Sequence, residues 1–176
     1  MNIVIAIDSL KGSLTSIEAG NAIAKGIHCA VPDANVTVRP LADGGEGTVD
    51  ALIYGMNGRR HSVTVTGPLG NPVICEYGII EESNTAVLEM SGAAGIILVP
   101  AESRNPLYTT TYGVGEVIKD AIQKGCRRFL VGIGGSATND GGMGMLQALG
   151  FEFLDHHGNP AAFGAKGLEN LAFISG

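Results

Sequence analysis

Three short segments of the chain combine glycine with carboxylate, hydroxyl or amide side chains, and each comes just before an expected helix. They are residues 8–13 (DSLKGS), 43–48 (DGGEGT) and 134–142 (GGSATNDGG). Glycine lets a ligand approach the backbone closely, and the free N–H groups at the start of a helix attract anions. Carboxylate oxygens can hold Mg²⁺ or accept a proton from a substrate hydroxyl. Together the three segments indicate a site that handles phosphate.

The first segment carries Asp8, Ser9 and Lys11 at the end of the first expected strand. Asp8 could accept a substrate proton or hold Mg²⁺, and Lys11 could neutralise a phosphate. Alternatively, Asp8 only stabilises the loop through an Asx turn and Lys11 is a solvated charge. The residue types leave both interpretations open.

The second segment places two acids, Asp43 and Glu46, around Gly44 and Gly45. Acids near the start of a helix stabilise it through the helix dipole, and Asp43 could act as a cap. That alternative explains one acid but not the run of glycines. We therefore favour a functional role for this segment.

The third segment offers hydroxyl and amide groups to a phosphate or a substrate, and a carboxylate to a metal. The residues expected to bind phosphate or substrate are Gly134, Gly135, Ser136, Thr138 and Asn139, and the expected metal ligand is Asp140. The alternative is a long turn in which Asn139 or Asp140 caps the following helix.

Residues 132–137 (GIGGSA) also satisfy the G-x-G-x-x-G/A pattern of dinucleotide-binding proteins. That pattern requires its glycines at the start of the helix, whereas the helix expected here starts only near Asp140. The chain contains no G-x-x-x-x-G-K-[ST] segment either. A dinucleotide site is therefore disfavoured, and no nucleotide-binding P-loop is expected.

The elements that must position these segments follow an α/β pattern. Residues 2–7 (NIVIAI) are typical of a buried parallel strand, and Thr15 with Glu18 forms a capping box that starts a helix. A second strand at residues 36–38 and a helix from Val49 complete a β-α-β-α unit. Ligands of such sheets collect at the carboxyl ends of the strands, where the polar segments lie.

The pattern changes after Gly58, so we predict one domain over residues 1–58 and part of a second over residues 59–176. The expected strands are residues 62–66, 72–80, 85–90, 128–133 and 151–154, and the expected helices are residues 113–124 and 141–149. The first three strands indicate a meander, with a turn at residues 67–71. No closing element is evident at the end of the chain.

Composition limits the remaining possibilities. The 176 residues are 45% hydrophobic and 16% charged, which predicts a folded core. The net charge of −6 and the lack of a basic stripe argue against a nucleic-acid partner. Three separated cysteines indicate reduced thiols, and the longest apolar run, residues 93–99, is too short to span a membrane. We expect a cytoplasmic protein with no membrane partner.

Taken together, the chain resembles the type-1 glycerate kinase family. The resemblance rests on DSLKGSLTSIEA (8–19), PLADGGEGTVDAL (40–52), VTGPLGNPV (65–73), TTTYGVGEVI (109–118) and GIGGSATNDGGMGMLQALG (132–150). Each motif alone is weak, but they run in family order across essentially the whole chain.

The resemblance implies a two-domain α/β architecture, in which a flavodoxin/Rossmann-like domain carries an inserted mixed α/β domain. Members of the family are longer, so the chain resembles the N-terminal half and is apparently truncated. A homo-oligomer or a complementing C-terminal chain would then supply the missing contacts.

The resemblance also implies an enzyme that uses ATP and Mg²⁺ to phosphorylate a hydroxyl of D-glycerate, giving 2-phosphoglycerate. Asp8, Asp43 or Glu46 would serve as base and Mg²⁺ ligand, and Lys11 would contact phosphate or the glycerate carboxylate. Two alternatives remain at this stage: an NAD(P)-binding oxidoreductase and a catalytically inactive fragment.

Overall fold

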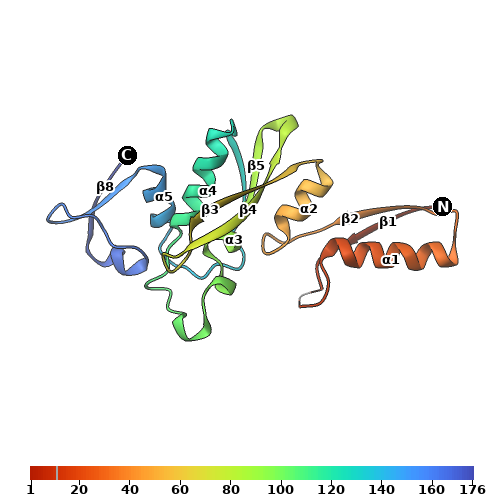
Figure 1. Ribbon diagram of the computed structural model, residues 1–176, viewed down its shortest axis with the longest axis horizontal. Helices are drawn as coiled ribbons and strands as arrows, with labels where there is room; N and C mark the ends of the chain where they lie inside the picture. Colours follow the sequence, from red (N-terminus) through yellow and green to blue (C-terminus); the bar gives the residue numbers. More distant parts are fainter. Residues whose placement is uncertain (11) are drawn as a thin grey trace.

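The computed structural model describes residues 1–10 and 12–176, so Lys11 lies outside the described residues. Its strands are β1 (Asn2–Ile7), β2 (Asn35–Pro40), β3 (Arg59–Thr66), β4 (Pro72–Ile80), β5 (Thr85–Glu89), β6 (Arg128–Gly132), β7 (Glu152–Asp155) and β8 (Leu171–Ser175). The α-helices are α1 (Ser16–Ala30), α2 (Thr48–Gly55), α3 (Met90–Ala94), α4 (Tyr112–Gln123) and α5 (Met143–Leu149). Short 3-10 turns occupy Glu81–Ser83, Ile96–Leu98, Ala101–Ser103 and Ala165–Asn170. Figure 1 shows an elongated molecule with the two termini at opposite ends.

The N-terminal unit consists of β1 and β2, which pair in parallel, and α1, which packs on them. The predicted capping box is confirmed, because Glu18 N–H donates to Thr15 Oγ1 while Glu18 Oε2 accepts from Thr15 N–H. Helix and strand approach closely at Gly20, where an added Cβ would lie 2.4 Å from Val38 Cγ1. Glycine at this position therefore allows α1 to sit directly on β2.

The central sheet has the strand order β3-β4-β5-β6. The predicted meander is confirmed, since β3, β4 and β5 pair antiparallel, and β6 then pairs parallel to β5. The turn between β3 and β4 closes where Gly67 N–H donates to the Asn71 carbonyl at 2.7 Å. Parallel pairing brings the carboxyl ends of β5 and β6 to the same edge of the sheet.

Helices pack on both faces of the central sheet. On one face Ile80 and Val87 pack with Val49 of α2. On the other face the alternate residues Ile79 and Leu88 join a larger core with α3 and α4. Because side chains alternate along a strand, α2 and α4 lie on opposite faces, which gives a helix–sheet–helix arrangement.

The packing of α2 bears on the domain organisation. Ile53 of α2 sits against Gly78 of β4, where an added Cβ would lie 2.2 Å from Ile53 Cγ2. These contacts tie α2 to the sheet that begins after residue 58. The boundary placed at Gly58 stays a prediction. Helix α2 lies before this boundary in the sequence but packs on strands that lie after it.

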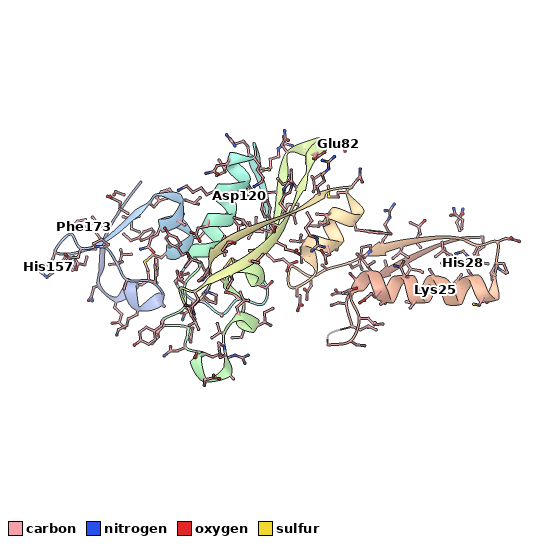
Figure 2. All side chains as sticks on the ribbon, in the orientation of Figure 1. Lys25, His28, Glu82, Asp120, His157 and Phe173 are labelled. Carbon is pink, nitrogen blue, oxygen red and sulfur yellow. The ribbon has the colours of Figure 1, made fainter. Side chains whose placement is uncertain are left out.

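The C-terminal segment forms an element that the sequence analysis did not anticipate. Residues 171–175 form β8, which pairs antiparallel with β7. Figure 2 shows Phe173 and His157 in this region, far from Lys25 and His28 on α1. Among the described residues, no helix has the length and apolar character needed to cross a membrane.

Candidate active site

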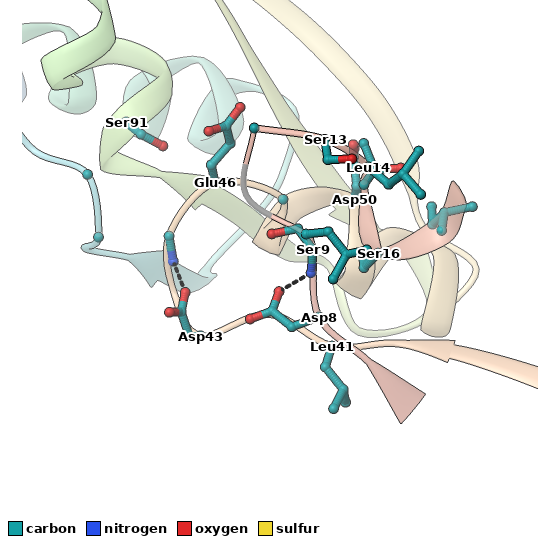
Figure 3. Close-up of a pocket in the computed structure, with 18 of the residues that line it drawn as sticks. Asp8, Ser9, Ser13, Leu14, Ser16, Leu41, Asp43, Glu46, Asp50 and Ser91 are labelled. Carbon is teal, nitrogen blue, oxygen red and sulfur yellow. Dashed lines mark hydrogen bonds between the residues drawn. The ribbon is translucent and has the colours of Figure 1, made fainter. Parts of the chain in front are cut away.

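The three polar segments meet around one cavity of about 550 Å³ (Figure 3). The predicted residues that line it are Asp8, Ser9, Asp43, Gly45, Glu46, Gly134 and Gly135. Segments far apart in the sequence thus share one site, as the strand-end argument predicts.

Two parallel strands deliver the carboxylates of this cavity. β1 ends at Ile7 and β2 at Pro40, and Leu41 N–H continues the pairing by donating to the Ile7 carbonyl at 2.9 Å. The two polar segments therefore leave the same edge, and Figure 3 shows Asp8 and Asp43 facing the same space.

Each of these two aspartates makes one local hydrogen bond. Ser9 N–H donates to Asp8 Oδ1 at 2.6 Å, and Gly45 N–H donates to Asp43 Oδ1 at 3.1 Å. The Asx-type interaction considered for Asp8 is therefore present. No described hydrogen bond uses either Oδ2 atom, so the local role leaves one oxygen of each carboxylate for a ligand.

The glycines of the segment after β6 allow two backbones to touch. Gly134 N–H donates to the Gly44 carbonyl at 2.8 Å. An added Cβ at Gly134 would lie 2.7 Å from Gly45 Cα, and one at Gly132 would lie 2.7 Å from Gly44 O. Glycine is required here so that the central sheet can hold the segment that carries Asp43 and Glu46.

All charged side chains described along the cavity are carboxylates. Besides Asp8, Asp43 and Glu46 they are Glu18 and Asp50. Asp50 pairs with Arg60. Hydrogen bonds from the Thr15 N–H and hydroxyl hold the pKa of the Glu18 carboxyl below its ordinary value.

The described ion pairs include none with Asp8, Asp43 or Glu46. A cavity with this lining attracts cations. The carboxylates of Asp8, Asp43 and Glu46 match the hard oxygen donors that Mg²⁺ prefers.

The described residues contain no group of three or more His, Cys, Asp or Glu arranged to hold a metal ion. Mg²⁺ in phosphoryl-transfer sites is usually bound by one or two carboxylates together with substrate phosphates and water. The donor set fits that mode of binding.

The remaining predicted residues of the third segment lie outside this cavity. Ser136 and Thr138 line a second cavity of about 240 Å³, together with Arg104. Asn139 is exposed and lines neither cavity. Ile96 borders both cavities, so the two lie next to each other.

Asp140 is only 1% exposed and is fully engaged within the protein. Its Oδ2 accepts from Thr111 N–H at 2.9 Å, and its Oδ1 accepts from Gly142 N–H at 3.0 Å. The Thr111 hydroxyl and Gly144 N–H also donate to it. The structural alternative explains this carboxylate, and the metal role proposed for Asp140 stays a prediction.

Helix α5 begins at Met143, with Gly142 as its N-cap residue. The glycines of residues 132–137 therefore precede a long loop and do not stand at the start of the helix. This placement removes the geometric basis for a dinucleotide site.

Sequence reasoning did not single out several polar residues at these cavities, among them Ser91 and Arg104. Ser91 is buried, and its hydroxyl donates to Glu89 Oε2 at 3.1 Å. It follows the carboxyl end of β5, next to β6, so the strand-end rule could have identified it. Arg104 lies in an irregular stretch, and no motif marks it.

Comparisons with known proteins agree on one family. A family profile described as the glycerate kinase family matches residues 3–175. The chain is 50% identical to a glycerate kinase of Bacillus subtilis (strain 168) over 174 residues. It is also 50% identical to a glycerate 2-kinase of Escherichia coli (strain K12) over 171 residues.

A solved structure shows that the similarity extends to the three-dimensional fold. The crystal structure of a protein assigned as glycerate kinase 2 from Salmonella typhimurium LT2 matches with a TM-score of 0.91 and 49% identity. That match covers 99% of this chain and 47% of the solved chain. The B. subtilis and E. coli matches cover 99% and 97% of this chain but 46% and 45% of those relatives. The chain thus spans about half the length of the relatives it matches.

Proposed function

The chain belongs to the glycerate kinase family, and on this premise we propose that the whole protein transfers the γ-phosphoryl group of ATP to D-glycerate. The product we propose is 2-phosphoglycerate, in keeping with the name of the E. coli relative. The observation that carries the proposal is the convergence of the three polar segments on one carboxylate-lined cavity.

Phosphoryl transfer depends on positioning and on charge neutralisation more than on covalent chemistry. Asp8 and Asp43 stand at one edge of the sheet with an oxygen each free of described hydrogen bonds. We propose that one of them accepts the proton of the glycerate hydroxyl as the new P–O bond forms and the bond between the γ-phosphorus and ADP breaks, which releases ADP. The other, with Glu46, would hold Mg²⁺.

Bound Mg²⁺ would neutralise the phosphate charges of ATP in this acidic cavity. Lys11 follows residues in the sequence that line the cavity, and it would contact the phosphoryl group that is transferred. Gly134 and Gly135 would let the phosphates approach the backbone closely. Ser9 would add a hydroxyl donor at the same edge.

We propose that activity needs the C-terminal part that the longer relatives possess. The two-stranded β1–β2 sheet leaves Val4 67% exposed in the middle of β1, which is unusual for a parallel strand. A C-terminal segment, a complementing chain or a second copy would cover it. The three cysteines are free thiols, which is consistent with a cytoplasmic protein.

The test is a kinase assay on two proteins. One is the chain alone, and the other is the chain extended by the C-terminal part of the B. subtilis relative. We expect the extended protein to release ADP only when both D-glycerate and Mg²⁺ are present, and the chain alone to be inactive or far slower. Phosphorus NMR of the product distinguishes 2-phosphoglycerate from 3-phosphoglycerate.

A folded extended protein that releases no ADP with D-glycerate would contradict the proposal. Assays without D-glycerate measure background ATP hydrolysis. Formation of 3-phosphoglycerate would overturn only the choice of hydroxyl.

A further inference from the structure

The second cavity differs from the first in the charge of its lining. Its charged side chain is Arg104, and its polar partners include Asn105, Thr109, Ser136 and Thr138. The first cavity, in contrast, has only carboxylates among its described charged residues. A small organic acid carries a negative carboxylate, which would be repelled by the first cavity and attracted by the second.

We propose that the second cavity binds the carboxylate group of the acid substrate, through the Arg104 guanidinium and the hydroxyl pair of Ser136 and Thr138. This inference rests on the proposed function, because it assigns a binding site to the carboxylate end of the same substrate. The acceptor hydroxyl would then extend toward the first cavity.

Arg104 has hydrogen-bond donors that are available for such a ligand. Its Nε–H donates to the Val99 carbonyl at 3.3 Å, which orients the guanidinium. None of the described ion pairs involves Arg104, and no described hydrogen bond uses its terminal nitrogens. A planar guanidinium binds a carboxylate through two parallel hydrogen bonds, so the unused nitrogens suit this group.

The two hydroxyls that line the same cavity as the arginine are held together by hydrogen bonds. Ser136 Oγ and Thr138 Oγ1 are 2.8 Å apart, and Thr138 N–H donates to Ser136 Oγ at 3.1 Å. When one hydroxyl donates to the other, the second keeps its own proton for a ligand. Thr109 holds the segment between them, because its hydroxyl donates to the Ala137 carbonyl at 2.7 Å.

The size and the position of the cavity also fit. A volume of about 240 Å³ is below the usual range for drug-sized ligands and suits a molecule of a few heavy atoms. Gly135 lines the first cavity and Ser136 the second, while Ile96 borders both. A short acid held by its carboxylate beside Ser136 would therefore have its other end near the phosphoryl-transfer site.

The kinetic test compares Arg104→Gln and Arg104→Lys with Arg128→Gln in the chain extended by the B. subtilis C-terminal part. Arg128 lies at the start of β6, is exposed and lines neither cavity. We expect Arg104→Gln to raise the KM for D-glycerate by about 10- to 100-fold, the range for a lost hydrogen-bonded charge. The KM for ATP should differ from that of the unsubstituted protein by less than about twofold, because the substitution removes a contact with D-glycerate and not with ATP.

Substrate choice gives a second readout. Glycerol has the hydroxyls but no carboxylate, so Arg104→Gln should sharply reduce the preference for D-glycerate over glycerol. Arg104→Lys, which keeps the charge but loses the planar fork, should give an intermediate KM. A raised KM for ATP with an unchanged KM for D-glycerate would overturn the proposal and assign the arginine to a nucleotide phosphate.

A binding test separates this inference from the proposed function. Amide NMR signals of residues 136–138 in the chain and in the extended protein should shift on titration with D-glycerate but not with glycerol. Arg104→Gln should abolish those shifts. Titration with inorganic phosphate in place of D-glycerate tests whether the cavity binds a phosphate instead of a carboxylate, and phosphate should produce weaker shifts. Shifts without kinase activity would contradict only the proposed function, whereas the absence of shifts in both proteins overturns the carboxylate site.

Discussion

The carboxylates of the first cavity and the buried Asp140 stand in similar sequence surroundings but have different structural roles. Asp43 is exposed and accepts one hydrogen bond from a backbone N–H two residues along the chain. Asp140 is 1% exposed and accepts from the Thr111 N–H and hydroxyl and from two backbone N–H groups at the start of α5. Each is followed by two consecutive glycines in the segment between a strand and the next helix.

The difference shows how a carboxylate is assigned to structure or to function. Asp140 joins α4 to α5, because Thr111 is the N-cap residue of α4 and Gly144 belongs to α5. Its hydrogen-bonding capacity is used within the protein. Asp43 leaves one oxygen without a described partner, so a ligand can use it.

The largest expected effect is on activity at the first cavity. In the extended protein, Asp8→Asn and Asp43→Asn should each lower kcat for D-glycerate phosphorylation, by about 10²- to 10⁴-fold where the residue acts as the base. The free energy of unfolding should change by no more than about 0.5 kcal/mol, because the amide oxygen can still accept the local N–H. Steady-state kinetics and urea denaturation measure the two quantities.

Asp33→Asn is the matched control for these variants, since Asp33 is an exposed residue in the turn between α1 and β2. It should leave both kcat and stability unchanged. If Asp8→Asn and Asp43→Asn also kept full kcat, the catalytic roles of these aspartates would be refuted.

The next largest effect is on stability at Asp140. Asp140→Asn presents an NH₂ group to backbone donors that need an acceptor, so the chain should lose about 3 kcal/mol of unfolding free energy. Asn139→Ala, at an exposed neighbouring position, should change it by less than about 0.5 kcal/mol. Denaturant titration of both variants provides the measurement.

An opposite result would reverse the comparison. If Asp140→Asn were as stable as the parent chain but the extended protein lost its Mg²⁺-dependent activity, Asp140 would belong with the functional carboxylates. The predicted metal role would then replace the structural one.

The sequence predicted local features well and distant ones poorly. The β1 strand and the Thr15 capping box depend on neighbouring residues, and both are confirmed. The Asp140 partnership depends on Thr111, 29 residues away, and no local pattern encodes it.

The candidate site shows the same division. The shared edge of parallel strands brought Asp8 and Asp43 together as expected. The separation of Ser136 from Gly135 into neighbouring cavities was not foreseeable, because it follows from tertiary contacts of the 95–109 region. Arg104 was missed for the same reason.

The smallest expected effect concerns the backbone contact that holds the functional carboxylates on the central sheet. In Gly134→Ala the new Cβ would lie 2.7 Å from Gly45 Cα and 3.0 Å from Gly45 N, so the residue 43–47 segment must move. We expect a loss of about 1–3 kcal/mol of unfolding free energy, as for other overpacked sites. Gly26→Ala, in α1 with nothing within 4 Å of the added Cβ, should instead stabilise the protein by up to about 1 kcal/mol.

Because the displaced segment carries Asp43 and Glu46, Gly134→Ala should also lower kcat in the extended protein, whereas Gly26→Ala should not. A Gly134→Ala protein with unchanged stability and unchanged kcat would mean that this contact does not position the carboxylates.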